Sequence, residues 1–192
     1  MSKSLYIKGL QCKKALWLKK YKPEVLTPPS NHLQAVFETG NEVGDLACKL
    51  FPKGKEVPYK SNKIELTQKL LNEGIKDIFE AAFEFDDILV LVDILHQKKD
   101  GSFEIYEVKS STWNQKKTID DIYKYIHDVS VQHYVLNKLG YNVSDCFITL
   151  LNTDYVMGPN IDYKGLFTSI NVTHEVLDLN TEISSNIKDL RK

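Results

Sequence analysis

The chain has 192 residues, of which 42% are hydrophobic and 27% charged, enough for one folded domain with its own core. This balance excludes an intrinsically disordered chain. The formal net charge of −1 excludes a uniformly basic surface, so nucleic acid would have to meet a local lysine patch. Arg191 is the single arginine, and arginine is the commonest reader of guanine. Binding directed at the phosphate backbone is therefore favoured over base-specific readout.

The sequence also indicates a compartment. Residues 1–4 lack the apolar stretch and the cleavage site of a signal peptide, and the longest apolar run, residues 88–92, is too short to span a membrane. The three cysteines, at positions 12, 48 and 146, are scattered and odd in number, which argues for a reducing compartment. We therefore expect a cytoplasmic protein with no membrane partner.

The first third of the chain is predicted to be helical. Lysines surround the short apolar stretch at residues 15–18, which indicates a short helix with a basic, solvated face. A longer helix is expected from its N-cap, Asn31, to Pro52, followed by another over about residues 63–77. The residues of the longer helix that recur at helical spacing, and so are expected in the core, are Leu33, Val36, Phe37, Val43, Ala47 and Leu50.

From residue 78 the hydrophobic pattern becomes that of strands. Three strands joined by tight turns are expected, over residues 78–85, 88–95 and 103–109. A long helix over about residues 119–139 and a fourth strand over residues 143–151 follow, and the tail is expected to hold short elements and one more helix. This order predicts an α/β sandwich, in which helices flank a mixed central sheet.

One acidic residue, Asp93, interrupts the otherwise apolar second strand. A carboxylate there is costly unless it is paired or bound to a metal. In the next strand Glu107 and Lys109 are two residues apart and so share a face. The intervening hairpin can bring Asp93 and Glu107 side by side, where two acids repel unless they share a cation or a proton. Removing either acid is expected to relieve that repulsion in the metal-free protein.

Magnesium suits such a pair, because it prefers oxygen ligands and usually takes one or two carboxylates. The backbone carbonyl of Val108 is the expected third protein ligand, and Mn²⁺ is the alternative ion. Such an ion polarises a phosphoryl oxygen and lowers the pKa of water, while Lys109 would orient the attacking water and stabilise the developing charge. A buried ion pair between Asp93 and Lys109, with Glu107 on the rim of the sheet, explains the same pattern without catalysis.

The series Asp93…Glu107-Val108-Lys109 resembles the signature of the PD-(D/E)XK nucleases. More closely, the chain resembles the RecB-like exonucleases that include the CRISPR-associated four-cysteine nucleases and an uncharacterised bacterial group near them. The likeness covers most of the chain, through residues 5–18, 40–44, 79–83 and 128–134.

This resemblance implies a restriction-endonuclease-like core in one domain over residues 1–192, either complete or the N-terminal part of a longer protein. It also implies Mg²⁺- or Mn²⁺-dependent hydrolysis of DNA, at single-stranded or duplex ends, with Gln132 supporting the site.

Two positions depart from the family pattern. Relatives offer the metal a histidine from the first helix, where this chain has Gly44, so Asn41 or Glu42 becomes the candidate ligand. Relatives also bind a 4Fe–4S cluster through one N-terminal and three C-terminal cysteines. Here Cys12 matches the first, but no cysteine follows Cys146. We therefore expect no iron–sulfur cluster from this chain, and expect Cys12 to be a small buried apolar residue.

Two functions are open at this stage. The complete set of Asp93, Glu107 and Lys109 favours a metal-dependent nuclease, in the first place an exonuclease. The missing histidine and cysteines favour a catalytically inactive module of nuclease fold that binds DNA or a partner protein. Trp113 is open in the same way, because its ring can stack on a base or seal the loop that follows its strand.

Overall fold

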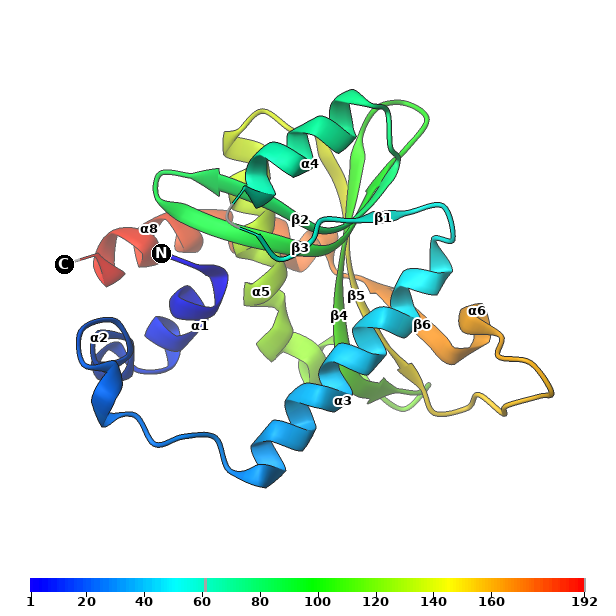
Figure 1. Cartoon of the computed structure of the whole chain (residues 1–192), viewed down its shortest axis with the longest axis horizontal. Helices are drawn as coiled ribbons and strands as arrows, with labels where there is room; N and C mark the ends of the chain where they lie inside the picture. Colours follow the sequence, from blue (N-terminus) through cyan, green and yellow to red (C-terminus); the bar gives the residue numbers. More distant parts are fainter. Residues whose placement is uncertain (61, 192) are drawn as a thin grey trace.

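A curled, mixed β-sheet with helices on both faces forms the centre of the computed structural model, which describes residues 1–60 and 62–191 (Figure 1). Within these ranges the strands are adjacent in chain order: β1 (Lys55–Glu56), β2 (Asp77–Phe85), β3 (Ile88–Gln97), β4 (Phe103–Trp113), β5 (Val143–Asn152) and β6 (Phe167–Asn171). The β1–β2 and β4–β5 pairs are parallel, and the other neighbours are antiparallel. The predicted mixed sheet is confirmed.

Most of the helices pack on one face of this sheet. The described helices are α1 (Lys3–Gln11), α2 (Lys13–Tyr21), α3 (Asn31–Ala47), α4 (Lys63–Asn72), α5 (Ile119–Lys138), α6 (Tyr163–Leu166), α7 (Thr173–Asp178) and α8 (Asn180–Leu190). Helix α5 connects the parallel strands β4 and β5 and contacts α1, α7 and α8 (Figure 1). Helix α3 contacts β4 and packs on a second, smaller apolar cluster. The sheet is thus buried between these two layers.

The tight turns form where the sequence predicts them. Asp86 and Asp87, between β2 and β3, both have positive φ, of 50° and 57°, as a two-residue hairpin turn requires. Gly101 and Gly140 each have φ of 87°, a conformation that glycine adopts without a Cβ clash. The β2–β3 hairpin and the stop of α5 therefore follow from local turn chemistry.

Two expectations for α3 are wrong. Its N-cap is Ser30, whose Oγ accepts a hydrogen bond from the backbone N–H of Leu33 at 3.3 Å, and Asn31 is the first helical residue. Only the second half of the helix is anchored, since Val43 and Ala47 are buried. The first half projects beyond the sheet, so three residues expected in the core are exposed: Leu33, Val36 and Phe37.

The expected burial of Cys12 is also wrong, because this residue is exposed. It stands between α1 and α2 with an extended backbone and ends α1 by donating its N–H to the carbonyl of Lys8. A residue at such a corner has no packing partner on its outer side.

Within residues 1–60 and 62–191, none of the helices combines the length and the hydrophobicity that crossing a bilayer requires.

Gly54, just before β1, permits a close approach of the chain to the ring of Phe79, since a Cβ at this position would overlap that ring. We expect Gly54→Ala to lower the free energy of unfolding by about 1–3 kcal/mol, as overpacking does. Gly40→Ala is the matched control: the corresponding space is open, and alanine in a helix should stabilise by about 1 kcal/mol. Urea denaturation of both variants measures this, and equal effects would contradict it.

Candidate active site

The regular alternation of side chains breaks at the same level of β2 and β3. Residues two apart on a strand normally share a face. However, Phe79 and Ile94 pack in the α3 cluster, whereas Ala81 and Val92, two residues further, pack in the main core. The ladder is continuous on both sides and omits only the facing residues between them, Glu80 and Asp93.

Glu80 marks this break with a φ of 55°, rare for a residue with a side chain. Asp93 lies opposite Glu80 in the register of β2 and β3, and one step beyond the last paired residues of β3 and β4 it lies opposite Glu107. Three carboxylates from three neighbouring strands therefore lie in one row across the sheet. The break explains how an apolar strand presents Asp93 without losing its buried neighbours.

Glu107 is the most enclosed of the three, with 2% of its side chain exposed. Its Oε2 accepts hydrogen bonds from Lys3 Nζ, at 2.8 Å, and from Gln132 Nε2, while its Oε1 accepts one from Lys109 Nζ at 2.7 Å. Burial alone would raise the pKa of Glu107, but the two ammonium groups outweigh it and hold that pKa at about 2. Glu107 is thus a buried carboxylate that stays ionised.

Asp93 is in the opposite electrostatic state. Burial, and then the negative charge of Glu107, raise the pKa of Asp93 to about 7, although the Lys3 ammonium and a backbone hydrogen bond favour its charged form. That bond runs from the N–H of Val108 to Asp93 Oδ2, at 2.8 Å. The second oxygen, Oδ1, lies 3.9 Å from Lys3 Nζ. Asp93, 27% exposed, is the less compensated member of the pair.

Five predicted site residues meet here: Asp93, Glu107, Val108, Lys109 and Gln132. Two charged residues that the sequence reasoning missed as site residues, Lys3 and Asp128, contact them. Lys109 Nζ lies 2.9 Å from Asp128 on α5, one helical turn before Gln132, whose Nε2 also donates to the carbonyl of Asp128. The i, i+4 spacing could have revealed Asp128, since such residues share a helix face. Lys3, from the first turn of α1, carries no comparable signal.

Glu80 was also missed as a site residue, and β2 gave a weaker signal than β3, because Glu80 shares its strand with two other acids, Asp77 and Glu84. The Glu80 carboxylate lies 3.9 Å from Lys63 Nζ on α4. Burial raises its pKa, and the Lys63 ammonium acts in the opposite direction. The positive φ of Glu80 is a strained backbone conformation, and such strain is often found at functional sites.

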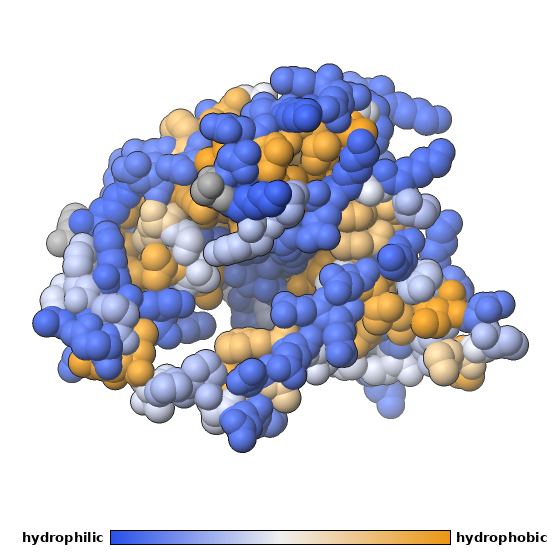
Figure 2. All heavy atoms as spheres, in the orientation of Figure 1, coloured by the Kyte–Doolittle hydropathy of each residue, from blue (hydrophilic) through white to orange (hydrophobic). Residues whose placement is uncertain are grey.

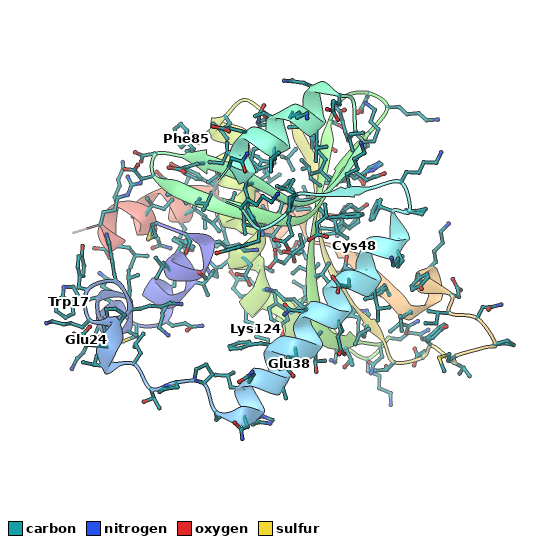
Figure 3. The ribbon with its side chains drawn as sticks, viewed as in Figure 1. Trp17, Glu24, Glu38, Cys48, Phe85 and Lys124 are labelled. Carbon is teal, nitrogen blue, oxygen red and sulfur yellow. The ribbon has the colours of Figure 1, made fainter. Side chains whose placement is uncertain are left out.

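A cavity of about 1370 Å³ lies over this row, with the strands as its floor and α3 as one wall. Figure 2 shows the hollow at the centre of this face, with hydrophilic residues around it, and Figure 3 places Glu38 on α3 and Cys48 at the C-terminal end of that helix. Of the two candidate first-helix ligands, Asn41 lines the cavity and Glu42 does not, whereas Asp45 does.

The donor set fits a small divalent ion that keeps several waters. Asp93 and Glu107 offer carboxylate oxygens, and Val108, whose N–H donates to Asp93, lines the same cavity and offers a backbone carbonyl. Among the described residues, no group of three or more His, Cys, Asp or Glu side chains is arranged to hold a metal. The fit therefore rests on two carboxylates and a carbonyl.

Comparison with known proteins identifies the fold. No protein-family model and no curated protein matches the sequence. The chain is similar to an alkaline exonuclease from Laribacter hongkongensis, with a TM-score of 0.50 and 11% identity over 100% of this chain and 87% of the other.

Two further structures are similar. That exonuclease in complex with dAMP gives a TM-score of 0.47 and 14% identity over 100% and 87% of the two chains. A phage-related exonuclease from Haemophilus somnus 129PT gives a TM-score of 0.49 and 13% identity over 98% of this chain and 79% of the other. The first likeness confirms the predicted restriction-endonuclease-like core. The RecB-like and CRISPR-associated branch stays a prediction.

The two acids of the pair should respond oppositely to neutralisation in metal-free protein. Asp93→Asn should raise the free energy of unfolding at pH 8 by roughly 1–3 kcal/mol, because the fold disfavours the Asp93 charge and asparagine can still accept the Val108 N–H. Glu107→Gln should lower it by about 3 kcal/mol, because two buried ammonium groups lose their nearest counter-ion. Denaturation in EDTA measures both, and changes of the same sign would contradict this assignment.

Proposed function

We propose that this chain is a divalent-metal-dependent nuclease, of exonuclease type, that hydrolyses phosphodiester bonds of DNA. The observation that carries the proposal is the meeting of Asp93, Glu107 and Lys109 on the floor of a large cavity in a nuclease-type fold. The similar structure is described as an exonuclease, and the resemblance of the sequence motifs favours DNA.

The surroundings of each site residue indicate its role in the proposed reaction. Asp93, Glu107 and the Val108 carbonyl would hold Mg²⁺ or Mn²⁺, which when bound neutralises phosphate charge and lowers the pKa of water. Lys109 is held by Glu107 and Asp128, and these two acids raise its pKa, so it stays cationic. It would orient the attacking water and stabilise charge on the phosphate. Gln132 is a positioning residue, since its amide fixes Glu107.

The cavity suits a polymer better than a small metabolite. Its volume of about 1370 Å³ exceeds the roughly 300–1,000 Å³ of small-molecule sites. Phe37, 53% exposed, and the exposed Tyr59 line it from different segments and offer rings for base stacking. Its lining holds six acidic residues and four lysines, a formal net charge of −2, so a bound cation would favour the entry of phosphate.

Cleavage of end-labelled single- and double-stranded DNA tests this function. We expect wild-type cleavage that needs Mg²⁺ or Mn²⁺ and stops in EDTA, and no cleavage by Asp93→Ala or Glu107→Ala. Lys109→Ala should lower kcat by roughly 10²-fold or more without weakening metal binding, since its role is aimed at the transition state. Absence of cleavage on every substrate would instead favour the inactive binding module, and activity of the Asp93 variant would remove the metal assignment.

DNA binding is expected to be weak, salt-dependent and nearly independent of sequence. Exposed lysines, such as Lys19, Lys20 and Lys116, offer a few phosphate contacts, and each contributes a slope of about −0.9 in log affinity against log salt on duplex DNA. Ca²⁺, as a non-cleaving ion, should strengthen binding by neutralising the cavity. Fluorescence anisotropy on unrelated oligonucleotides measures this, with Asp93→Asn as the control that should lose the Ca²⁺ effect. Strong preference for one sequence would contradict it.

A further inference from the structure

The ammonium of Lys3 lies between the two carboxylates assigned to the metal. Its Nζ is 2.8 Å from Glu107 Oε2 and 3.9 Å from Asp93 Oδ1. The other nearby ammonium, that of Lys109, contacts the opposite oxygen of Glu107 and faces Asp128. Lys3 is therefore the cation that joins Asp93 to Glu107.

A divalent ion held by this pair needs the same oxygens. Asp93 Oδ2 accepts the Val108 N–H, so Oδ1 is the oxygen that can turn to an ion shared with Glu107 Oε2. Magnesium sits about 2.1 Å from its ligand oxygens. An ion at that distance from both oxygens would lie within about 5 Å of Lys3 Nζ, and two cations repel strongly where water is excluded. Lys3 and the ion thus compete for the same oxygens.

We propose that Lys3 is a tethered cation, which holds the metal position in metal-free protein and is displaced by the incoming divalent ion. The proposal rests on the metal assignment of the proposed function. The displacement needs only the side chain to move, because α1 itself is fixed: Tyr6 is fully buried, and a β-bridge joins Ser2 to Leu89 of β3. Lys3 lines the large cavity, which gives its side chain room to turn away.

This arrangement has two opposing effects. Without an ion, the lysine compensates a buried acid pair that would otherwise be strongly destabilising. With an ion, the lysine competes, so the metal affinity is lower than Asp93 and Glu107 would give by themselves. Lys3 therefore exchanges metal affinity for stability of the metal-free protein.

Isothermal titration calorimetry with Ca²⁺ on metal-free protein tests the competition. Lys3→Met, which keeps the length and removes the charge, should bind Ca²⁺ about tenfold or more tightly than wild type, from loss of a cation at close range. Lys63→Met is the matched control, because Lys63 lines the same cavity but pairs with Glu80. It should change the affinity by less than about threefold, the general effect of one lost charge.

A thermal melt gives the second readout. In EDTA the melting temperature of Lys3→Met should be lower than that of wild type, and Ca²⁺ should raise it by more than it raises the melting temperature of wild type. If it does not fold in EDTA, far-UV circular dichroism should show that Ca²⁺ restores the fold, and failure to do so overturns the proposal. Unchanged or weaker Ca²⁺ binding by Lys3→Met, or no Ca²⁺ binding by either protein, also overturns it.

The two proposals fail differently. If Lys3→Met binds Ca²⁺ more tightly but the wild-type protein does not cleave DNA, the role of Lys3 is supported and the nuclease function is contradicted. Metal-dependent cleavage with equal affinities would do the reverse.

Discussion

The arrangement of the site depends on one buried carboxylate. Glu107 lies inside the protein and remains charged because three donors from three elements converge on it: Lys3 from α1, Lys109 from β4 and Gln132 from α5. A buried anion with fewer partners would be costly. This requirement ties the first turn of α1 and the middle of α5 to the same point of the sheet. The packing of two helices is thereby coupled to the chemistry of one side chain.

The strands, the turns and the acid pair could be predicted because their signals are local. Asp93 stands out against four apolar neighbours, Glu107 and Lys109 are two apart, and Gly101 and Gly140 mark turns. Secondary structure and candidate chemistry are both written in such short patterns. These patterns do not indicate which remote segments of the chain lie close together. Lys3 reaches Glu107 across 104 positions of the chain, and no spacing rule reveals such a contact.

Helix α3 shows a different limit of sequence reasoning. Its apolar residues follow a helical period along its length, which predicts one continuous buried face. The structure buries only Val43 and Ala47, because the sheet ends before the helix does. Two of the remaining apolar residues, Val36 and Phe37, line the wall of the cavity instead. Periodicity identifies the face that prefers apolar surroundings, but not whether protein or ligand will supply them.

The break in alternation at Glu80 and Asp93 implies that the site depends on the number of residues in each strand as well as on their identity. Each strand carries one residue more than a regular ladder needs, and the two extra residues face each other. Deleting only one would shift one strand against the other and turn its core side chains outward. Deleting both would leave a regular hairpin with its apolar faces intact and without the two acids that face each other. Glu80 and Asp93 are therefore extra residues that the fold tolerates only as a matched pair.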